Sequence, residues 1–168
     1  DDLSDKNEPS ELLAIVKMKD EKREFDLCPN PVIVLFDRPS NKGNLGTLLR
    51  SCDAFGVDGL IITGHSVDIY DPEVISASMG SFFKVPFMRL YQNTDVDAYL
   101  GVLKEKYPRL LVVGTTAHNE AKIYDIDLTV PIVLLIGNET EGLSNYCYQM
   151  ADVLATIPMS EGSGASSF

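Results

Sequence analysis

The sequence has little of what marks a secreted, membrane or metal-binding protein. Its three cysteines form an odd set without paired spacing, and Cys52 and Cys147 fall in helical patterns as small core residues of a reducing compartment. The two histidines stand alone, so the sequence predicts no metal site. The longest apolar run, residues 130–136, is too short for a membrane span, and the N-terminal residues lack a signal-peptide pattern. We therefore expect a cytoplasmic protein without a membrane or metal partner.

Basic residues are also in short supply. The chain of 168 residues has 14 Lys and Arg against 25 Asp and Glu, which gives a net charge of −11. An acidic chain does not attract nucleic acid nonspecifically, because phosphate contacts need basic side chains. If the protein binds RNA, its basic residues must be concentrated locally, or another domain or subunit must contribute.

What the sequence does contain is an alternation of short apolar strands and amphipathic helices. Strands are predicted at residues 32–36, 60–62, 87–91, 110–113, 132–136 and 153–157, and helices at residues 45–55, 72–79, 96–107 and 143–150. This alternation predicts an α/β fold: an open, mostly parallel sheet with helices on both faces. Residues 1–30 lie outside it and are interpreted as a linker or a frayed edge segment before one domain at residues 31–168.

A first candidate motif is residues 44–50, which follow the first strand and open a helix. The carboxyl ends of parallel strands form the usual ligand side of such a sheet. Asn44 lies at the predicted helix start, and Arg50 lies near the boundary of the apolar stripe. Taken singly, Asn44 is better explained as a helix N-cap, and Arg50 as the partner of Asp53 on a solvated face. Their functional interpretation depends on the two motifs that follow.

The second motif, residues 137–142, comes directly after the most apolar strand and contains Glu139. Gly137 would let the backbone turn and approach a ligand closely, and Gly142 would relieve steric strain before the next helix. The segment is neither a Walker loop nor a Gly-x-Gly-x-x-Gly fingerprint. The alternative is a simple strand-to-helix turn with acidic residues. A third segment, Ile157-Pro158-Met159, ends the last strand and leads through a Gly/Ser-rich loop to Phe168.

Together, these three segments resemble in order, spacing and context the signature motifs of the SpoU/TrmH-type RNA ribose 2'-O-methyltransferases of the SPOUT superfamily. The resemblance extends from about Val32 to the last residue. It implies a C-terminal trefoil knot, S-adenosylmethionine as cofactor, a homodimer, and structured RNA as substrate. A passage like Ser4 to Pro9 joins an upstream RNA-binding domain to the catalytic domain in longer members, which favours ribosomal over transfer RNA.

The resemblance also implies site residues. The catalytic set is Asn44, Arg50, Glu139 and Ser167, and the cofactor set is Thr115, Thr116, Ala117, Gly137, Asn138, Ile157, Met159 and Phe168. Arg50 would grip a target phosphate and stabilise the developing alkoxide, because a guanidinium is a poor base. Asn44 and Ser167 would orient the ribose or Arg50, and Glu139 would fix the guanidinium or the loop.

The third motif departs from the family pattern. The sequence stops at Ser167-Phe168, where an asparagine would follow, and the preceding loop is longer, so Ser166 is an alternative to Ser167. If the loop is not part of a site, residues 162–167 are a disordered polar tail. We expect the native chain to continue into a C-terminal helix.

Two other functions compete with this interpretation. An ordinary Rossmann enzyme would need a glycine fingerprint after the first strand and an acidic residue ending the second, and neither residues 36–39 nor 62–64 supply them. A non-catalytic RNA-binding module on the same scaffold is favoured by the net charge of −11 but not by the intact trio of Asn44, Arg50 and Glu139.

Overall fold

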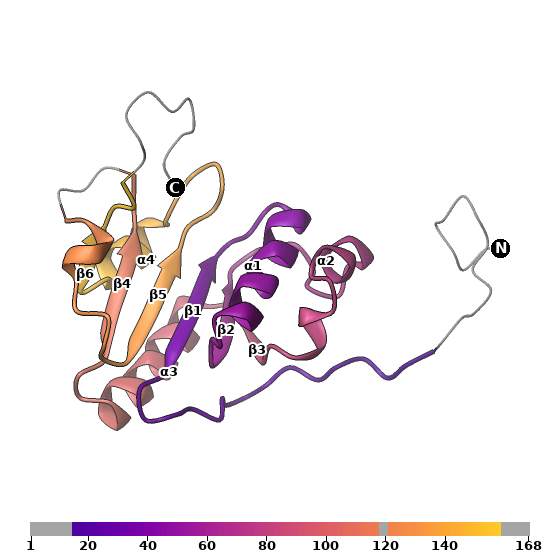
Figure 1. Ribbon diagram of the computed structural model, residues 1–168, viewed down its shortest axis with the longest axis horizontal. Helices are drawn as coiled ribbons and strands as arrows, with labels where there is room; N and C mark the ends of the chain where they lie inside the picture. The colour runs from indigo at the N-terminus through magenta and orange to yellow at the C-terminus, as the bar shows by residue number, and fades with distance from the viewer. Residues whose placement is uncertain (1–14, 118–120, 159–168) are drawn as a thin grey trace.

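The computed structural model describes residues 15–117 and 121–158, and within them six strands form a single sheet in which every pairing is parallel (Figure 1). The strands are β1 (Val32–Asp37), β2 (Gly59–Thr63), β3 (Phe87–Leu90), β4 (Leu111–Thr115), β5 (Ile132–Ile136) and β6 (Val153–Ala155). Their order across the sheet is β3-β2-β1-β5-β4-β6. The predicted fold class is therefore confirmed.

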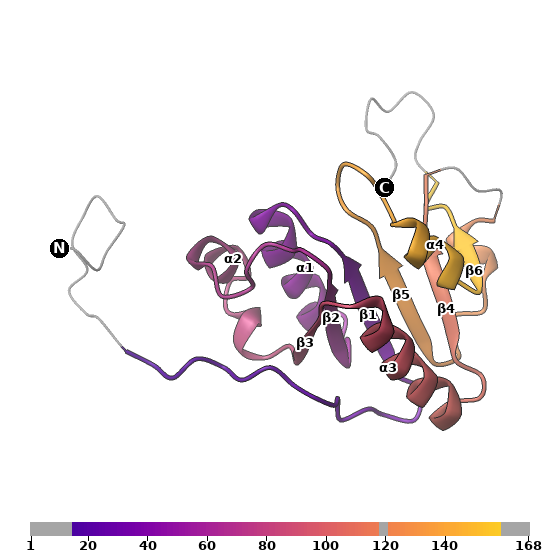
Figure 2. The same cartoon turned by 180° about the vertical axis from the view of Figure 1, so that it is seen from behind.

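Helices cover both faces of the sheet (Figures 1 and 2). They are α1 (Lys42–Ala54), α2 (Pro72–Ala77), α3 (Asn93–Lys106) and α4 (Asn145–Met150), with 3-10 turns η1 (Ser81–Phe83) and η2 (Ile123–Asp125). α1 and α2 lie on one face, and α3 and α4 lie on the other. No helix among the described residues is long and apolar enough to cross a membrane.

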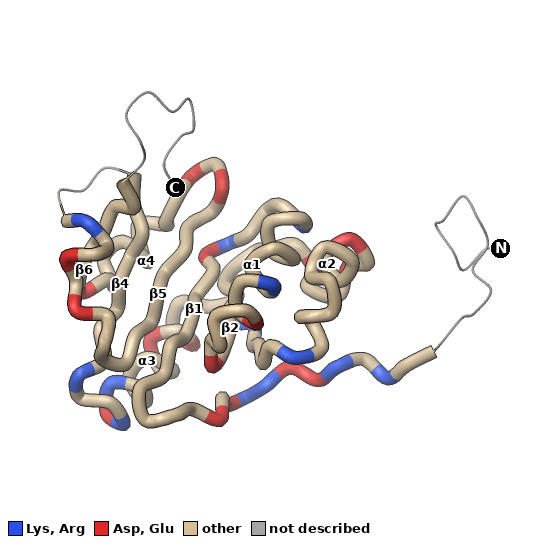
Figure 3. The backbone as a smooth tube through the Cα atoms, viewed as in Figure 1, with Lys and Arg blue, Asp and Glu red and all other residues tan. Residues whose placement is uncertain are grey.

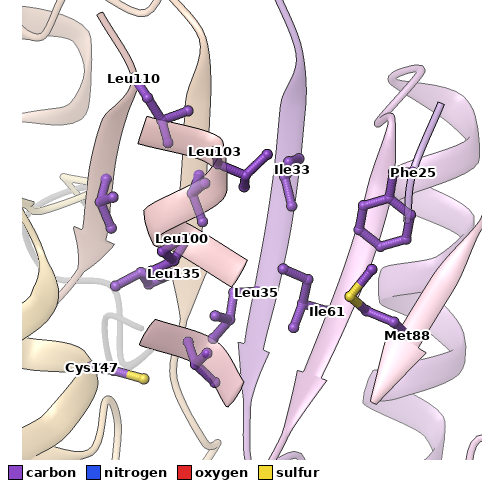
Figure 4. Close-up of a cluster of buried hydrophobic side chains, with 13 residues drawn as sticks. Phe25, Ile33, Leu35, Ile61, Met88, Leu100, Leu103, Leu110, Leu135 and Cys147 are labelled. Atoms are coloured by element: carbon purple, nitrogen blue, oxygen red, sulfur yellow. The ribbon is translucent and has the colours of Figure 1, made fainter. Parts of the chain in front are cut away.

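The apolar side chains of the central strands divide between two cores. In β1, Ile33 and Leu35 pack with α3, whereas Val34 and Phe36 pack with α1 (Figure 4 shows the α3 side). This alternation follows from the two-residue period of a strand and explains why a strand buried on both sides is apolar throughout. Cys52 and Cys147 belong to opposite cores, and burial raises the pKa of both thiols to about 12. Their predicted role as inert core residues is confirmed.

Several predicted element ends were wrong by a few residues. The helix expected to reach Met79 ends at Ala77, because Met79 and Gly80 have φ values of 51° and 93°, which a right-handed helix cannot accommodate. The helix expected from residue 143 begins at Asn145, because the Ser144 side chain caps it by accepting from the backbone N–H of Cys147 at 3.2 Å. The last strand ends at Ala155, two residues early.

The segment before β1 is extended and crosses the lower end of the sheet (Figure 1). Residues 15–31 contain no helix or strand, but they dock on the domain. Phe25 is 7% exposed and packs its ring against Gly59, where a Cβ would lie 2.3 Å from the ring. Lys19 donates through Nζ to the carbonyl of Phe82 at 2.8 Å, and the Lys22 amide donates to the carbonyl of Phe87. This part of the expected linker is therefore packed onto the domain.

The end of β6 is hydrogen-bonded on both sides by the connection between β4 and β5. Thr116 donates its amide to the carbonyl of Ala155 at 2.9 Å. On the other side, Thr156 donates to Ala121, and Ile123 donates to Thr156. The C-terminal segment thus lies between two parts of one loop. The trefoil knot also depends on the path of residues outside the described ranges, so it stays a prediction.

Candidate active site

The strand order reverses its direction between β1 and β5, and a pocket of about 750 Å³ opens at this end of the sheet. β2 and β3 continue from β1 to one side, whereas β4 and β6 lie beyond β5 on the other. Open α/β sheets bind ligands outside the carboxyl ends of the strands at such a switch point. The pocket is lined by α1, by the ends of β1, β4 and β5, by the loop after β5 and by Tyr148 of α4.

Glu139 joins the first two predicted motifs across this opening. Its Oε2 accepts hydrogen bonds from the hydroxyl and the amide of Ser40, at 2.8 and 3.2 Å. Its Oε1 accepts from the Asn41 amide and from Nδ2 of Asn44, both at 3.2 Å. The carboxylate therefore holds the turn that begins α1, where the positive end of the helix dipole favours a negative charge.

The charge on Glu139 is stabilised by these contacts. Burial alone would raise the pKa of its carboxyl group, but the net shift is downward because the carboxylate accepts hydrogen bonds from backbone amides and from the side chains of Ser40 and Asn44. Glu139 is thus an ionised acceptor at neutral pH. It contacts the loop, and no contact with Arg50 is found within the described residues.

The loop that carries Glu139 is closed tightly on itself. The amides of Asn138 and Gly142 each donate to the other's carbonyl at 2.9 Å. A Cβ on Gly137 would lie 2.3 Å from the carbonyl carbon of Gly142, so only glycine fits there. Gly142 has φ of 71°, which also favours glycine. Asn138 donates through Nδ2 to the Arg38 carbonyl at 2.7 Å, which places its side chain in the loop's own scaffold.

The sequence interpretation gave Asp37 no role and did not foresee the carboxylate partner of Arg38. Asp37 is 3% exposed and accepts from the Thr63 hydroxyl at 3.0 Å and the Ser144 amide at 2.7 Å. Arg38 has a left-handed backbone, with φ of 52°, and pairs through Nη1 with Glu141 at 2.8 Å. These two residues tie the end of β1 to the loop after β5. Asp37 could have been found from the sequence, because it is an acidic residue that directly follows the apolar run of a buried strand.

Asn44 and Arg50 of the first motif do not have the structural roles that were considered for each of them alone, as a helix N-cap and as the partner of Asp53. The N-cap of α1 is Asn41, whose side chain accepts from the Asn44 amide at 2.9 Å, so Asn44 is not the cap. Arg50 forms no ion pair with Asp53. Asp53 instead accepts from the Ser81 hydroxyl at 2.9 Å and pairs with Lys84 at 3.1 Å.

Arg50 is exposed and lies outside the pocket of its own chain. Asn44, Thr47, Leu48 and Ser51 line the pocket and share one face of α1. Arg50 lies about 100° around the helix from the middle of that face, given 3.6 residues per turn. Within residues 15–117 and 121–158 its side chain has no hydrogen bond or ion pair. Its guanidinium is therefore available to a group from outside the chain.

The predicted cofactor residues fall into three groups. Five of them line the pocket, namely Thr115, Thr116, Ala117, Gly137 and Asn138. Ile157 does not line it and is 48% exposed, so the prediction for this residue is not supported by the pocket. Met159 and Phe168 lie outside the described residues, as do Ser167 of the catalytic set and its alternative Ser166.

The basic residues near this edge do not make a broadly positive surface. Four basic residues lie in segments near this edge, Arg38, Lys42, Arg50 and Lys84, but three of them are paired with carboxylates. Lys42 lies 2.9 Å from Asp71, for example. Acidic and basic residues are interspersed along the described chain (Figure 3). Across that part of the chain, no group of three His, Cys, Asp or Glu residues is placed to hold a metal ion.

Known proteins are similar to this chain in sequence. The sequence profile of the SpoU rRNA Methylase family matches residues 31–166. The 23S rRNA (uridine(2479)-2'-O)-methyltransferase of Streptomyces viridochromogenes is 40% identical over 167 residues, which are 98% of this chain and 58% of that protein. The RlmP 23S rRNA (guanosine(2553)-2'-O)-methyltransferase of Bacillus subtilis is 26% identical, over 90% of this chain and 57% of its own length.

Solved structures agree in fold. The SpoU methyltransferase AviRb of Streptomyces viridochromogenes in complex with AdoMet superposes with a TM-score of 0.81 at 36% identity, covering 89% of this chain and 57% of that one. AdoMet-bound rRNA methyltransferase from Sinorhizobium meliloti gives a TM-score of 0.71 at 31% identity, covering 83% and 52%. The chain therefore spans a little over half the length of these relatives.

Proposed function

Because the chain belongs to the SpoU rRNA methylase family, we propose that it transfers the methyl group of S-adenosylmethionine to a ribose 2'-hydroxyl of ribosomal RNA. The observation that supports this most directly is the set of hydrogen bonds from Ser40, Asn41 and Asn44 to Glu139. These bonds bring two motifs that are far apart in the sequence to the edge of one pocket. The named activities of the relatives support the same reaction.

The pocket fits a cofactor of this size. Its volume of about 750 Å³ lies within the usual range for small-molecule sites, on the order of 300 to 1,000 Å³. Thr115, Thr116, Ala117 and Gly137 would hold S-adenosylmethionine there. The cofactor supplies an electrophilic methyl group on a sulfonium, so the protein's task is to position the acceptor and help remove its proton. Met159 and Phe168 remain proposed contacts outside the described residues.

Each side chain of the proposed catalytic set has a separate task. Arg50 binds a phosphate of the substrate and stabilises the charge that develops on the ribose oxygen, and this phosphate shares in accepting the proton that the 2'-hydroxyl loses. Glu139 acts as a positioning residue, since its carboxylate orients the Asn44 amide and fixes the turn before α1. Asn44 and Ser167 orient the ribose.

We also propose a homodimer in which Arg50 serves the pocket of a second copy. Arg50 is exposed, is unpaired within the described part of the chain, and does not line its own pocket. A second copy would supply the missing cation to each site. Light scattering tests the dimer, and mixing an Arg50→Ala chain with a Gly137→Ala chain tests sharing. Activity in the mixture but in neither variant alone is the expected result, and an inactive mixture would reject the shared site.

Two proposals concern what surrounds this domain. Residues 1–30 would link an upstream RNA-binding domain to a catalytic domain at residues 31–168, and a further C-terminal helix would complete that domain. Leu134 and Ile136 of β5 are only partly buried beside α1, and Ile136 and Leu48 line the pocket, which supports an additional covering element on this face. The protein would act in the cytoplasm.

Methyl transfer to defined RNAs tests the function. Tritiated S-adenosylmethionine is supplied with unmodified 23S rRNA transcript or with unmodified tRNA, and the product is mapped for 2'-O-methyl groups. We expect one modified ribose in the rRNA. Modification of tRNA alone would change the substrate class. Binding of RNA without any methyl transfer would favour the non-catalytic module.

A further inference from the structure

Next to α1, and outside the pocket, lies an exposed surface with two large apolar side chains, Met79 and Phe83, to which the proposed reaction gives no role. Met79 is 76% exposed and Phe83 is 60% exposed, and both belong to the connection between α2 and β3. With Arg50 and Lys84 they form what we call the α1–η1 surface. Exposed apolar side chains beside basic groups mark a binding surface more often than isolated ones do.

Contacts along α1 place Arg50 beside the turn at residues 78–80. Gly46 abuts α2, because a Cβ on it would lie 2.5 Å from Cβ of Ala77. Two turns later, Asp53 contacts Ser81 and Lys84 of the η1 region. Residues at positions 46, 50 and 53 lie on the same side of a helix. Arg50 therefore lies level with the turn between Ala77 and Ser81, at the exposed margin of that side, while Leu49 forms the buried margin.

The turn itself is rigidly held. Ser78 is fully buried, donates its hydroxyl to the Ile75 carbonyl at 2.7 Å and accepts from the Phe82 amide at 3.3 Å. The Ser81 hydroxyl donates to Asp53. The exposed side chains are thus presented by a fixed backbone, which lowers the entropy lost when a partner binds.

Met79 occupies this turn at a cost to the fold. Its φ of 51° is a left-handed conformation that glycine and asparagine adopt more readily than methionine. A large apolar side chain that is exposed and also strained is not explained by packing. Such outliers gather at sites of function.

The charge of the surface favours an anionic partner. Asp53 is the acidic group that contacts it, and Lys84 neutralises Asp53 at 3.1 Å. Among the residues that the structure describes, Arg50 then remains as an uncompensated cation in a chain whose net charge is −11. Cations that bind phosphates and apolar or aromatic side chains that contact bases are the combination that binds unpaired nucleic acid.

We propose that the α1–η1 surface binds unpaired nucleotides of the RNA substrate next to the one that is methylated. Phe83 and Met79 contact bases, while Arg50 and Lys84 contact the backbone. The proposal rests on the proposed function and adds to it a surface that holds the strand beside the reacting ribose. Under this proposal, Met79 and Phe83 contact bases that neighbour the phosphate bound by Arg50.

The test measures RNA binding of the intact protein to an unmodified 23S rRNA transcript and to a labelled oligouridylate of about twelve nucleotides, a length that spans one typical single-strand site. Phe83→Ala and Met79→Ala should each weaken binding to both RNAs by about tenfold, the usual effect of losing one base contact. Met79→Asn should weaken binding as much while its Tm stays at or above that of the wild type. Val102→Ala, which alters a 62% exposed side chain on α3 across the sheet, should bind as the wild type does.

Affinity for S-adenosylmethionine and mass by light scattering should be the same for all these variants. Wild-type RNA affinity in Phe83→Ala and Met79→Ala would overturn the proposal. A change in mass would do so too, because Met79 and Phe83 would then contact the second copy of the chain and not the RNA. If the wild type and both variants methylate the transcript equally well, this proposal is wrong and the proposed function stands. A wild-type protein that neither binds nor methylates it removes the proposed function as well.

Discussion

Replacing Glu139 with glutamine removes a charge while keeping the size of the side chain. The carboxylate accepts four hydrogen bonds, and its two oxygens each face two donors. A glutamine amide turns one of these acceptors into a donor, so two donors of the loop lose their partner. Hydrogen bonds to a charged group contribute about 1.5 to 3 kcal/mol each. Because the partners are exposed and can bond to water instead, we expect a total loss of about 1 to 2 kcal/mol.

Thermal unfolding measures this loss. For a domain of this size, about 1.5 kcal/mol corresponds to a fall in Tm of roughly 4 °C. Methyl transfer should fall more steeply, by about a hundredfold in kcat/KM, because a displaced Asn44 misplaces the acceptor. Affinity for S-adenosylmethionine should change little. Glu105→Gln, which neutralises an exposed carboxylate on α3, is the matched control and should leave both quantities unchanged.

The pH dependence separates the charge from the shape of the side chain. The pKa of Glu139 is lower in the folded chain than its ordinary value, so its contribution to stability is present above the unfolded pKa. That contribution is lost as the pH falls through the folded pKa. The difference in Tm between the wild type and Glu139→Gln should therefore be full near pH 7 and shrink below about pH 4.3, the ordinary value for Glu. A difference that stays constant to the acid limit would refute the reasoning.

Three further outcomes are expected. Arg50→Ala and Arg50→Lys should both abolish methyl transfer with Tm and cofactor affinity nearly unchanged, because a point charge does not replace a planar fork on a phosphate; unfolding of either variant in calorimetry would speak against this. Phe25→Ala should lower the free energy of unfolding in urea by about 3 kcal/mol, since the buried ring packs on Gly59; a loss below about 1 kcal/mol would mean that the segment before β1 is not docked in solution. Gly137→Ala should lose cofactor binding in calorimetry, because its Cβ meets backbone, whereas Gly142→Ala has open space and should cost only about 1 kcal/mol for its left-handed φ; equal effects would contradict the loop geometry.

The fold was predictable because each strand carries its own signal. Residues 32–36 and 132–136 are apolar at every position, which is what burial on both faces requires. Asn44 and Glu139 were assigned to one catalytic set through the motifs that contain them, but the hydrogen bond between them was not predicted. The strands could be predicted from local apolar runs. The site residues could be predicted because the family motifs link two segments that are distant in the sequence.

Partners chosen by tertiary structure were not predictable. Asp53 is three positions from Arg50 and was a reasonable partner for it on a helix, but Ser81 and Lys84 of η1 take that carboxylate. The same cause explains why the basic residues near the pocket do not make a positive surface. Lys42 pairs with Asp71, the N-cap of α2, and no local sequence pattern predicts this pair. The charge of a side chain can be read from the sequence. Whether a distant group of opposite charge neutralises it can be known only from the fold.

The position of β1 in the sheet has a consequence for synthesis of the protein. β1 is made first but lies at the centre, and Val32 pairs with Ile132 of β5. A chain that grows at about 5 to 20 residues per second leaves this edge of β1 open for roughly 5 to 20 seconds. During that time, an apolar strand edge is exposed to neighbouring chains, which is the usual start of aggregation. The bonds that hold Glu139 against Ser40 form only after β5 has closed that edge, so no partly made chain possesses the site.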